Sequence, residues 1–187
     1  MKRLFIAIDL SDVPEIQLLQ NSLKLKLGGS QINWTKSENQ HITIKFLGST
    51  AKEIIPKICE TLDEISKNTE PFKLISSNLG VFGSSYKPRI IWLSFAETKI
   101  LEDLAKTVHQ KAIPLGFEPD RQNFVPHLTL GRIRKIDSKR YFQQIMEELR
   151  HPEIPEIYID KIYLYESRLQ KNGAEYQIIE EFSLRKR

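Results

Sequence analysis

The feature that most constrains the fold of this chain is an internal repeat with an offset of 86 residues. Three pairs of segments match at this offset: residues 3–6 with 89–92, residues 12–27 with 98–113 (Leu18 over Leu104), and residues 41–44 (HITI) with 127–130 (HLTL). A slip of one residue then matches residues 54–62 with 141–149. A repeated unit is usually one supersecondary structure that packs against its copy. The sequence therefore predicts two related lobes, although two unrelated units with similar patterns would look alike.

Hydrophobic periodicity predicts the same order of elements in each half of the chain: strand, helix, strand, helix, strand. Strands are expected at residues 3–8, 31–35, 41–47, 72–82, 89–95, 124–133, 157–165 and 175–184, and helices at residues 12–27, 51–67, 98–113 and 138–150. Ser11 or Asp12 is expected to cap the first helix, with Pro14 tolerated in its first turn. Because no Gly/Ser-rich linker separates the halves, we expect one domain over residues 1–187.

Composition narrows the class of protein. Hydrophobic residues make up 40% and charged residues 28% of the 187 residues, which excludes disordered and fibrous proteins. The single cysteine excludes an internal disulfide and a multi-thiolate zinc site, and we expect Cys59 to lie in the core. The longest apolar runs have about five residues, far short of the roughly 20 that span a membrane. We expect a cytoplasmic α/β or α+β protein, and its net charge of +4 is compatible with a polyanionic partner.

The most informative residues are two His-x-Thr pairs at matching points of the repeat. With four histidines and eight threonines in the chain, two such pairs arise by chance in about 1% of cases, whereas one pair alone is a weak signal. On a strand, His41 and Thr43 share one face and Ile42 lies on the other. The apolar face must be buried, so the His-Thr face is expected to be open. The same holds for His127 and Thr129, and the two faces can line one groove.

Two imidazoles and two hydroxyls are suited to phosphoryl chemistry. An ordinary histidine titrates near neutral pH, so one imidazole can accept a proton while the other donates one. Threonine hydroxyls can hydrogen-bond to the non-bridging phosphate oxygens. We expect no metal and no cofactor, because the chain shows no third ligand at a spacing typical of metal sites. Taken singly, each histidine can equally be a histidine with only a structural role on a strand.

Two cations lie close to these motifs. Lys45 continues the His41–Thr43 face by alternation, and we expect it to reach a phosphate. Its repeat partner is Gly131, where a bulge can turn Arg132 inward for bidentate phosphate contact. Both cations can instead be solvated basic residues.

Four other residues are of types that could belong to such a site. Trp34 and Phe46 can stack on a base, but we expect both to be buried in the core. His109 and His151 have no companion motif, and we interpret both as surface residues.

These residues make the chain similar to the two-histidine (2H) phosphoesterases, of the RNA 2′,3′-cyclic phosphodiesterase or 2′-5′ RNA ligase type. The similar stretches are RLFIAIDL, INWTKSENQHITIKFLG, PRIIWL, FVPHLTLGR and LYESRLQKNGAEY. The resemblance implies an α+β fold with two pseudo-symmetric lobes. In it, antiparallel sheets flank a central groove and helices lie on the outside.

The resemblance also implies a reaction and residue roles. The reaction is metal-independent hydrolysis of a 2′,3′-cyclic phosphate at an RNA end to a 2′-phosphate, with 2′-5′ ligation as the reverse reaction in vitro. By position, His41 would be the proton donor to the ribose 3′-oxygen and His127 the proton acceptor. The phosphate would be held by Thr43, Thr129 and Arg132. The chain departs from the family at Val125, where members often carry a polar or basic residue.

Two alternatives stay open. One keeps the chemistry but acts on a small cyclic phosphate such as an ADP-ribose derivative. The other is a non-catalytic RNA-binding module, although the aromatic string typical of such a sheet platform does not occur in the sequence. We expect a monomer that binds RNA ends or nucleotides and no membrane.

Overall fold

The computed structural model describes residues 1–84, 87–119, 123–170 and 173–185, and its fold is α+β. The strands are β1 (Lys2–Asp9), β2 (Gln31–Trp34), β3 (His41–Thr50), β4 (Phe72–Gly83), β5 (Pro88–Ala96), β6 (His127–Lys135), β7 (Ile157–Ile159), β8 (Lys161–Gln170) and β9 (Gly173–Ser183). The α-helices are α1 (Pro14–Lys26), α2 (Ile55–Lys67), α3 (Lys99–Ala112) and α4 (Lys139–Glu148).

The described strands form one strongly bent antiparallel sheet in the order β7-β4-β5-β6-β3-β1-β8-β9, with β2 on β6. The bend lies between β3 and β6, whose recorded pairing is limited to Ile42 and Leu128. One lobe therefore contains β3, β1, β8 and β9, and the other contains β7, β4, β5, β6 and β2. Each lobe takes strands from both halves of the chain.

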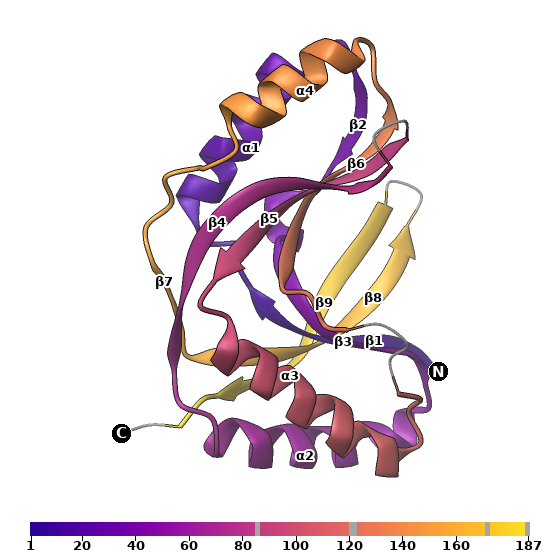
Figure 1. Ribbon diagram of the computed structural model, residues 1–187. Helices are drawn as coiled ribbons and strands as arrows, with labels where there is room; N and C mark the ends of the chain where they lie inside the picture. Colours follow the sequence, from indigo (N-terminus) through magenta and orange to yellow (C-terminus); the bar gives the residue numbers. More distant parts are fainter. Residues whose placement is uncertain (85–86, 120–122, 171–172, 186–187) are drawn as a thin grey trace.

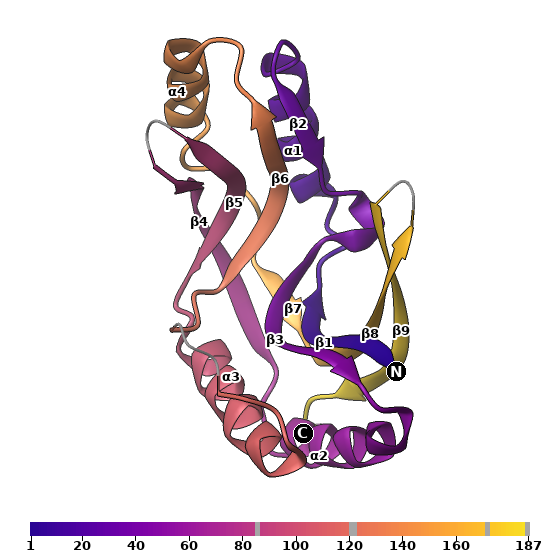
Figure 2. The ribbon, with the colours of Figure 1, turned by 90° about the vertical axis from the view of Figure 1, so that its right-hand side faces the viewer.

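The helices lie in two pairs at opposite ends of the molecule (Figures 1 and 2). Helices α2 and α3 pack against each other and against strands of the β3-β1-β8-β9 lobe. Helices α1 and α4 lie at the other end, beside β4, β5 and β6 (Figure 1). The predicted arrangement, with helices outside the antiparallel strands of two lobes, is confirmed, and the strands of the two lobes are joined in one bent sheet.

Apolar side chains on the helix-facing side of the sheet form the main core. In β1 these are the alternate residues Leu4, Ile6 and Ile8, each at most 2% exposed. Phe5 and Ala7 lie on the opposite face, where they form a second small cluster with Tyr165. This strand is thus buried on both faces, which explains why its sequence is a continuous apolar run.

The repeat offset predicted for the first strand and helix is wrong by one residue. Leu18 is 67% exposed, whereas Leu104 is 3% exposed. An offset of 85 instead pairs buried residues with buried residues: Ile16 with Leu101, Leu19 with Leu104, and Leu23 with Val108. A shift of one residue moves a side chain to the other face of a strand, so burial is a stricter guide than sequence identity here.

Two predicted strand boundaries also differ from the structure. The segment 157–165 is not one strand: it breaks at Asp160, so that β7 before the break lies on β4 and β8 after it lies on β1. A single apolar run therefore serves both lobes. The strand expected from residue 124 begins at His127. Helix α1 begins at Pro14 after Val13, without the expected Ser11 or Asp12 side-chain cap.

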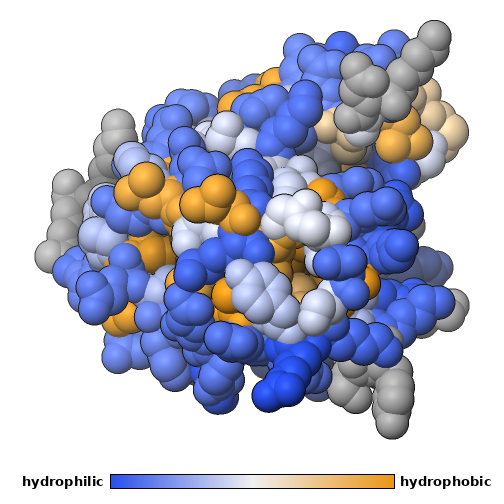
Figure 3. Space-filling view, turned by 90° about the horizontal axis from the view of Figure 1, so that it is seen from above, coloured by the Kyte–Doolittle hydropathy of each residue, from blue (hydrophilic) through white to orange (hydrophobic). Residues whose placement is uncertain are grey.

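The surface seen from the α1–α4 end is mainly hydrophilic, with hydrophobic side chains scattered across it (Figure 3). Single exposed apolar residues of this kind are normal for a globular protein. Within the described residues, none of the helices combines the length and the apolar character that a membrane span requires.

Candidate active site

A cavity of about 500 Å³ lies where the two lobes meet, and both His-x-Thr motifs line it. Its lining residues are Thr35, Asn39, His41, Thr43, Ile44, Lys45, Phe46, Ile90, His109, Asn123, Phe124, Val125, His127, Thr129, Arg132 and Tyr176. All six site residues expected from the sequence are in this set.

The pairing of Ile42 with Leu128 brings the two motifs together. These residues occupy the same place in the two motifs, and both side chains are fully buried on the core face. Alternation then directs the histidine and threonine on either side of each to the opposite face. In an antiparallel pair, this sets His41 near Thr129 and Thr43 near His127.

The His41 ring is oriented by its own chain. Its Nδ1 lies 2.7 Å from the Asn39 carbonyl oxygen and its Nε2 lies 3.0 Å from Thr43 Oγ1. A carbonyl can only accept, so Nδ1 carries the hydrogen. In the neutral ring, Nε2 therefore accepts the hydrogen bond of the Thr43 hydroxyl.

His127 is oriented in the same way. Its Nδ1 donates to the Val125 carbonyl oxygen at 2.8 Å, again two residues earlier in the chain. Val125 stands where members of the similar family often carry a polar or basic residue. This difference leaves the contact intact, because the contact uses the main-chain carbonyl of Val125. Fixing Nδ1–H on a carbonyl leaves Nε2 as the proton-accepting atom of the neutral imidazole.

Burial is the main influence on the protonation of His41. It lowers the pKa of His41 below the ordinary value of 6.5, because the charged imidazolium is poorly solvated there. Repulsion from Arg132, and from His127 when that ring carries a proton, lowers this pKa further, whereas the Asn39 carbonyl and the Asp9 carboxylate oppose the shift. The neutral ring is therefore favoured in the unliganded protein.

Aromatic rings hold both imidazoles. The His41 ring lies 5.0 Å from Phe5 and 5.2 Å from Tyr176, edge-on to the latter. The His127 ring lies edge-on to Phe82 at 5.0 Å. Packing of this kind restricts the rotation of both rings.

A β-bulge follows the threonine in each motif. Along β1 and β3, Ala7 pairs with Thr43 but the next residue, Ile6, pairs with Lys45, so Ile44 is an extra residue. Along β5 and β6, Leu130 is extra in the same way between Thr129 and Gly131. A bulge interrupts the alternation of side chains.

The bulge in β6 explains the position of Arg132. Without it, Arg132 would lie on the face opposite to Thr129; with it, Arg132 lines the cavity. Gly131 is required at this point, because a Cβ there would lie 2.8 Å from Ile32 Cγ2 and 2.9 Å from the Trp34 ring. The predicted bulge at Gly131 is thus present. Trp34, expected to be buried in the core, is half-buried and packs against the core.

The bulge in β3 corrects two expectations. Lys45 lies in the cavity wall but not by simple alternation: it is 2% exposed, and its Nζ donates to the Glu118 carbonyl oxygen at 3.2 Å. Phe46 takes the place equivalent to Arg132 and is 67% exposed, so its expected burial in the core is wrong. Its ring is instead a hydrophobic wall of the cavity.

Two further histidines are expected from the sequence to be surface residues. His151 is exposed, as expected. His109 is half-buried on α3, lines the cavity, and its Nε2 lies 2.9 Å from the Ile44 carbonyl oxygen. The sequence holds no signal for this contact, because it joins residues 65 positions apart.

Three further observations concern other residues of the cavity, possible metal ligands and the single cysteine. Tyr176 of β9 and Asn123 also line the cavity; Tyr176 ends the stretch LYESRLQKNGAEY, but neither residue is assigned a role from the sequence. Among the described residues, no three His, Cys, Asp or Glu side chains form a group that could hold a metal ion. Cys59 is half-buried against the main core rather than fully inside it.

Comparison with protein families gives a match over almost the whole chain. The model of the LigT-like phosphoesterases matches residues 8–92 and 95–176. A protein of Methanocaldococcus jannaschii named RNA 2′,3′-cyclic phosphodiesterase is 34% identical over 182 residues, which cover 96% of this chain and 99% of that protein. A protein of the same name from Aquifex aeolicus is 33% identical over 89% of this chain and 87% of its own.

Solved structures show the same fold. A protein of Thermus thermophilus matches with a TM-score of 0.80 and 23% identity, and each chain is covered to 98%. Escherichia coli LigT, solved in complex with 3′-AMP, matches with a TM-score of 0.77 and 22% identity over 98% of each chain.

Proposed function

The chain belongs to the LigT-like phosphoesterases, and from this premise we propose that it hydrolyses 2′,3′-cyclic phosphates at RNA ends. The observation that carries the proposal is the pairing of Ile42 with Leu128. This pairing places both His-x-Thr motifs in the wall of one cavity. The names of the Methanocaldococcus and Aquifex relatives support the same substrate.

In the proposed reaction His127 and His41 divide the proton transfers. The neutral His127 Nε2 removes a proton from water, whose oxygen attacks phosphorus. The bond between phosphorus and the ribose 3′-oxygen breaks, and His41 gives a proton to that oxygen. The product is a 2′-phosphate. No metal is needed in this scheme, because protonation stabilises the leaving oxygen directly.

The remaining groups would bind the phosphate. Thr43 and Thr129 carry hydroxyls on the cavity face, and Arg132 can form two parallel hydrogen bonds to phosphate oxygens. We propose a longer-range role for Lys45: its ammonium contributes positive charge from the wall, where the Glu118 carbonyl holds it. These groups would balance the charge that develops on the non-bridging oxygens.

The proton-donor role of His41 depends on the bound substrate. In the unliganded protein, burial lowers the pKa of His41, which disfavours a proton donor. The negative phosphate raises this pKa when it binds beside the ring, because an opposite charge favours the imidazolium. The substrate would thus bring His41 into its active protonation state.

The surface beside the cavity favours an RNA end over a small molecule. Arg132 is exposed at the cavity, and Arg134 is exposed two residues further along β6. In the described part of the chain neither guanidinium forms an ion pair with a carboxylate, so both can contact phosphates of a longer strand.

The test is to incubate the protein with an oligoribonucleotide 2′,3′-cyclic phosphate and a chelator, and to identify the product by mass spectrometry and chromatography. We expect a 2′-phosphate. His41→Ala and His127→Ala should each lower kcat/KM on the order of 10²- to 10⁴-fold. His151→Ala is the matched control, because His151 is exposed outside the cavity.

Each other outcome overturns part of the proposal. If the wild type shows no turnover but binds RNA equally well with and without the two histidines, the protein is a binding module. A 3′-phosphate product contradicts the role of His41. A preference for ADP-ribose cyclic phosphate over RNA ends contradicts the proposal that RNA ends are the substrate.

A further inference from the structure

Each of the two β-bulges places one main-chain carbonyl of its His-x-Thr strand where the strand pairing is interrupted. Ile44 and Leu130 are the extra residues, so their carbonyl groups fall where the regular ladder is interrupted. Both residues are at most 2% exposed. A buried carbonyl needs a hydrogen-bond donor, because water cannot reach it.

The Leu130 oxygen accepts a hydrogen bond from the Thr35 main-chain N–H at 2.9 Å, and side chains from two helices donate to both bulge carbonyls. Gln20 on α1 donates through Nε2 to the Leu130 oxygen at 2.9 Å and to the Thr35 oxygen at 2.7 Å. His109 on α3 donates through Nε2 to the Ile44 oxygen at 2.9 Å. In each case the helix and the bulge come from different halves of the chain.

The two contacts are alike in role but not in residue type. By the offset of 85 that relates α1 to α3, Gln20 corresponds to Ala105, one helical turn before His109. A glutamine on one turn and a histidine on the next thus serve equivalent carbonyls.

Each bulge sets the direction of the side chains around it. In β3 the bulge separates Thr43 from Lys45 and Phe46, and all three line the cavity. If the Ile44 peptide rotates, the face presented by the residues after it changes. The donor that fixes this peptide therefore fixes the geometry of the cavity wall.

We propose that His109 is a positioning residue of the site: its hydrogen bond to the Ile44 carbonyl fixes the β3 bulge and thereby aims Thr43, Lys45 and Phe46 at the substrate. Gln20 supports the β6 bulge before Arg132 as a second donor to the Leu130 carbonyl, beside the Thr35 N–H. The inference rests on the proposed hydrolysis for its kinetic consequence, but its structural part does not.

The test uses His109→Leu, which removes the donor, and His109→Gln, which keeps an N–H donor of the type that Gln20 provides. We expect His109→Leu to lower kcat on cyclic phosphate on the order of tenfold to a hundredfold through misplaced groups. His109→Gln should recover most of this loss. Gln110→Leu is the matched control, because Gln110 is an exposed neighbour on α3.

A measurement without substrate separates this inference from the proposed function. Amide hydrogen exchange followed by NMR should be faster at Lys45 and Phe46 in His109→Leu, and close to wild type in His109→Gln. If the wild type shows no hydrolysis but the exchange pattern holds, the proposed function fails and the positioning role stands.

Two results would overturn the positioning role. One is wild-type kinetics and exchange in His109→Leu. The other is a His109→Gln protein that is folded by circular dichroism but as impaired as His109→Leu. If His109→Leu does not fold, Gln20→Leu is the second variant, and it should raise KM more than it lowers kcat, through Arg132.

Discussion

Both candidate catalytic histidines owe their orientation to a carbonyl two residues earlier. Asn39 and Val125 serve His41 and His127 through main-chain oxygens, at 2.7 and 2.8 Å. The side chains at these two positions differ in polarity, yet the contact is the same. At the residue scale, the two histidines share their Nδ1 contacts and differ at Nε2, where the described residues pair only His41 with its motif threonine, and in the burial and charge around His41.

This asymmetry predicts the pH dependence of the reaction. If His41 must be protonated, kcat/KM falls as pH rises through its pKa in the free protein, which lies below 6.5 because burial disfavours the imidazolium. In the complex the phosphate charge raises the pKa, so the alkaline limb of kcat should lie at higher pH than that of kcat/KM. Both profiles are measured with a cyclic phosphate at constant ionic strength.

An alkaline limb of kcat/KM well above 6.5 would contradict the assignment of His41 as the donor in the free protein. The control is His151→Ala, whose profile should superimpose on that of the wild type, since His151 lies outside the cavity.

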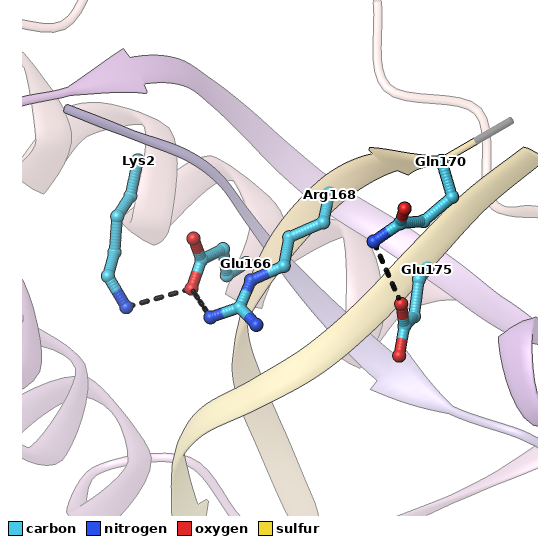
Figure 4. Close-up of polar contacts among 5 residues, drawn as sticks. All are labelled: Lys2, Glu166, Arg168, Gln170 and Glu175. Carbon is cyan, nitrogen blue, oxygen red and sulfur yellow. Dashed lines mark hydrogen bonds and ion pairs between the residues drawn. The ribbon is translucent and has the colours of Figure 1, made fainter.

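At the scale of the elements, β1 is tied to β8 by a carboxylate with two cations. Glu166 Oε2 lies 2.8 Å from Lys2 Nζ and 3.0 Å from Arg168 Nη2 (Figure 4). Across the β8–β9 hairpin, Gln170 Nε2 donates to Glu175 at 3.4 Å. The Glu166 side chain is 11% exposed, so its ion pairs are better shielded from solvent than those on the open surface.

We expect Glu166→Gln to lower the free energy of unfolding by about 1 kcal/mol near pH 7. Arg168 and Lys2 hold the pKa of Glu166 below its ordinary value of 4.5. A depressed carboxyl pKa stabilises the fold above the unfolded-state pKa, and this stabilisation is lost as pH falls through the folded-state value. Urea unfolding at several pH values measures it; a difference between the two proteins that persists in strong acid would contradict this account.

Strand β6 carries the second prediction at this scale. Arg134→Ala should raise KM for an oligoribonucleotide cyclic phosphate by about threefold to tenfold and leave KM for a mononucleotide cyclic phosphate unchanged, because only the longer substrate extends beyond Arg132. The salt dependence of KM should also become shallower. Arg140→Ala on α4 removes the same charge elsewhere and serves as the control. Equal effects on both substrates would refute a role in binding the longer strand.

At the scale of the whole molecule, the two lobes cannot be assigned to the two halves of the sequence. Strands β8 and β9 complete the lobe of β1 and β3, while β4 completes the lobe of β5 and β6. Helix α3 packs on the first of these lobes. We propose that residues 1–187 are a single domain of two related lobes with exchanged strands.

Such a domain should unfold in one cooperative transition. We expect equal calorimetric and van't Hoff enthalpies, and we expect the fragments 1–84 and 87–187 to be unfolded when separate, because each lacks strands of both lobes. Calorimetry of the full chain and circular dichroism of the fragments measure this. Two separate transitions, or one fragment with a cooperative melt, would contradict the proposal of a single domain.

The sequence by itself determined what depends on local periodicity. The helix faces and the open His-Thr faces of β3 and β6 follow from side-chain spacing along one element, whereas the α+β class was implied by the family resemblance. The burial of Ile42 and Leu128 follows from the same alternation and is found in the structure. Gly131 also indicated the bulge that turns Arg132 into the cavity.

Only the tertiary structure decided what depends on the partner of each element. The β3 bulge, the exposure of Phe46, the break at Asp160 and the contact from His109 to Ile44 all arise from pairing between segments far apart in sequence. The same pairing placed α3, from the second half of the chain, on the lobe that contains β1 and β3 from the first half. The physical reason is that alternation within a strand is set by its own backbone, whereas register and bulges are set by the neighbouring strand, whose position no local pattern encodes.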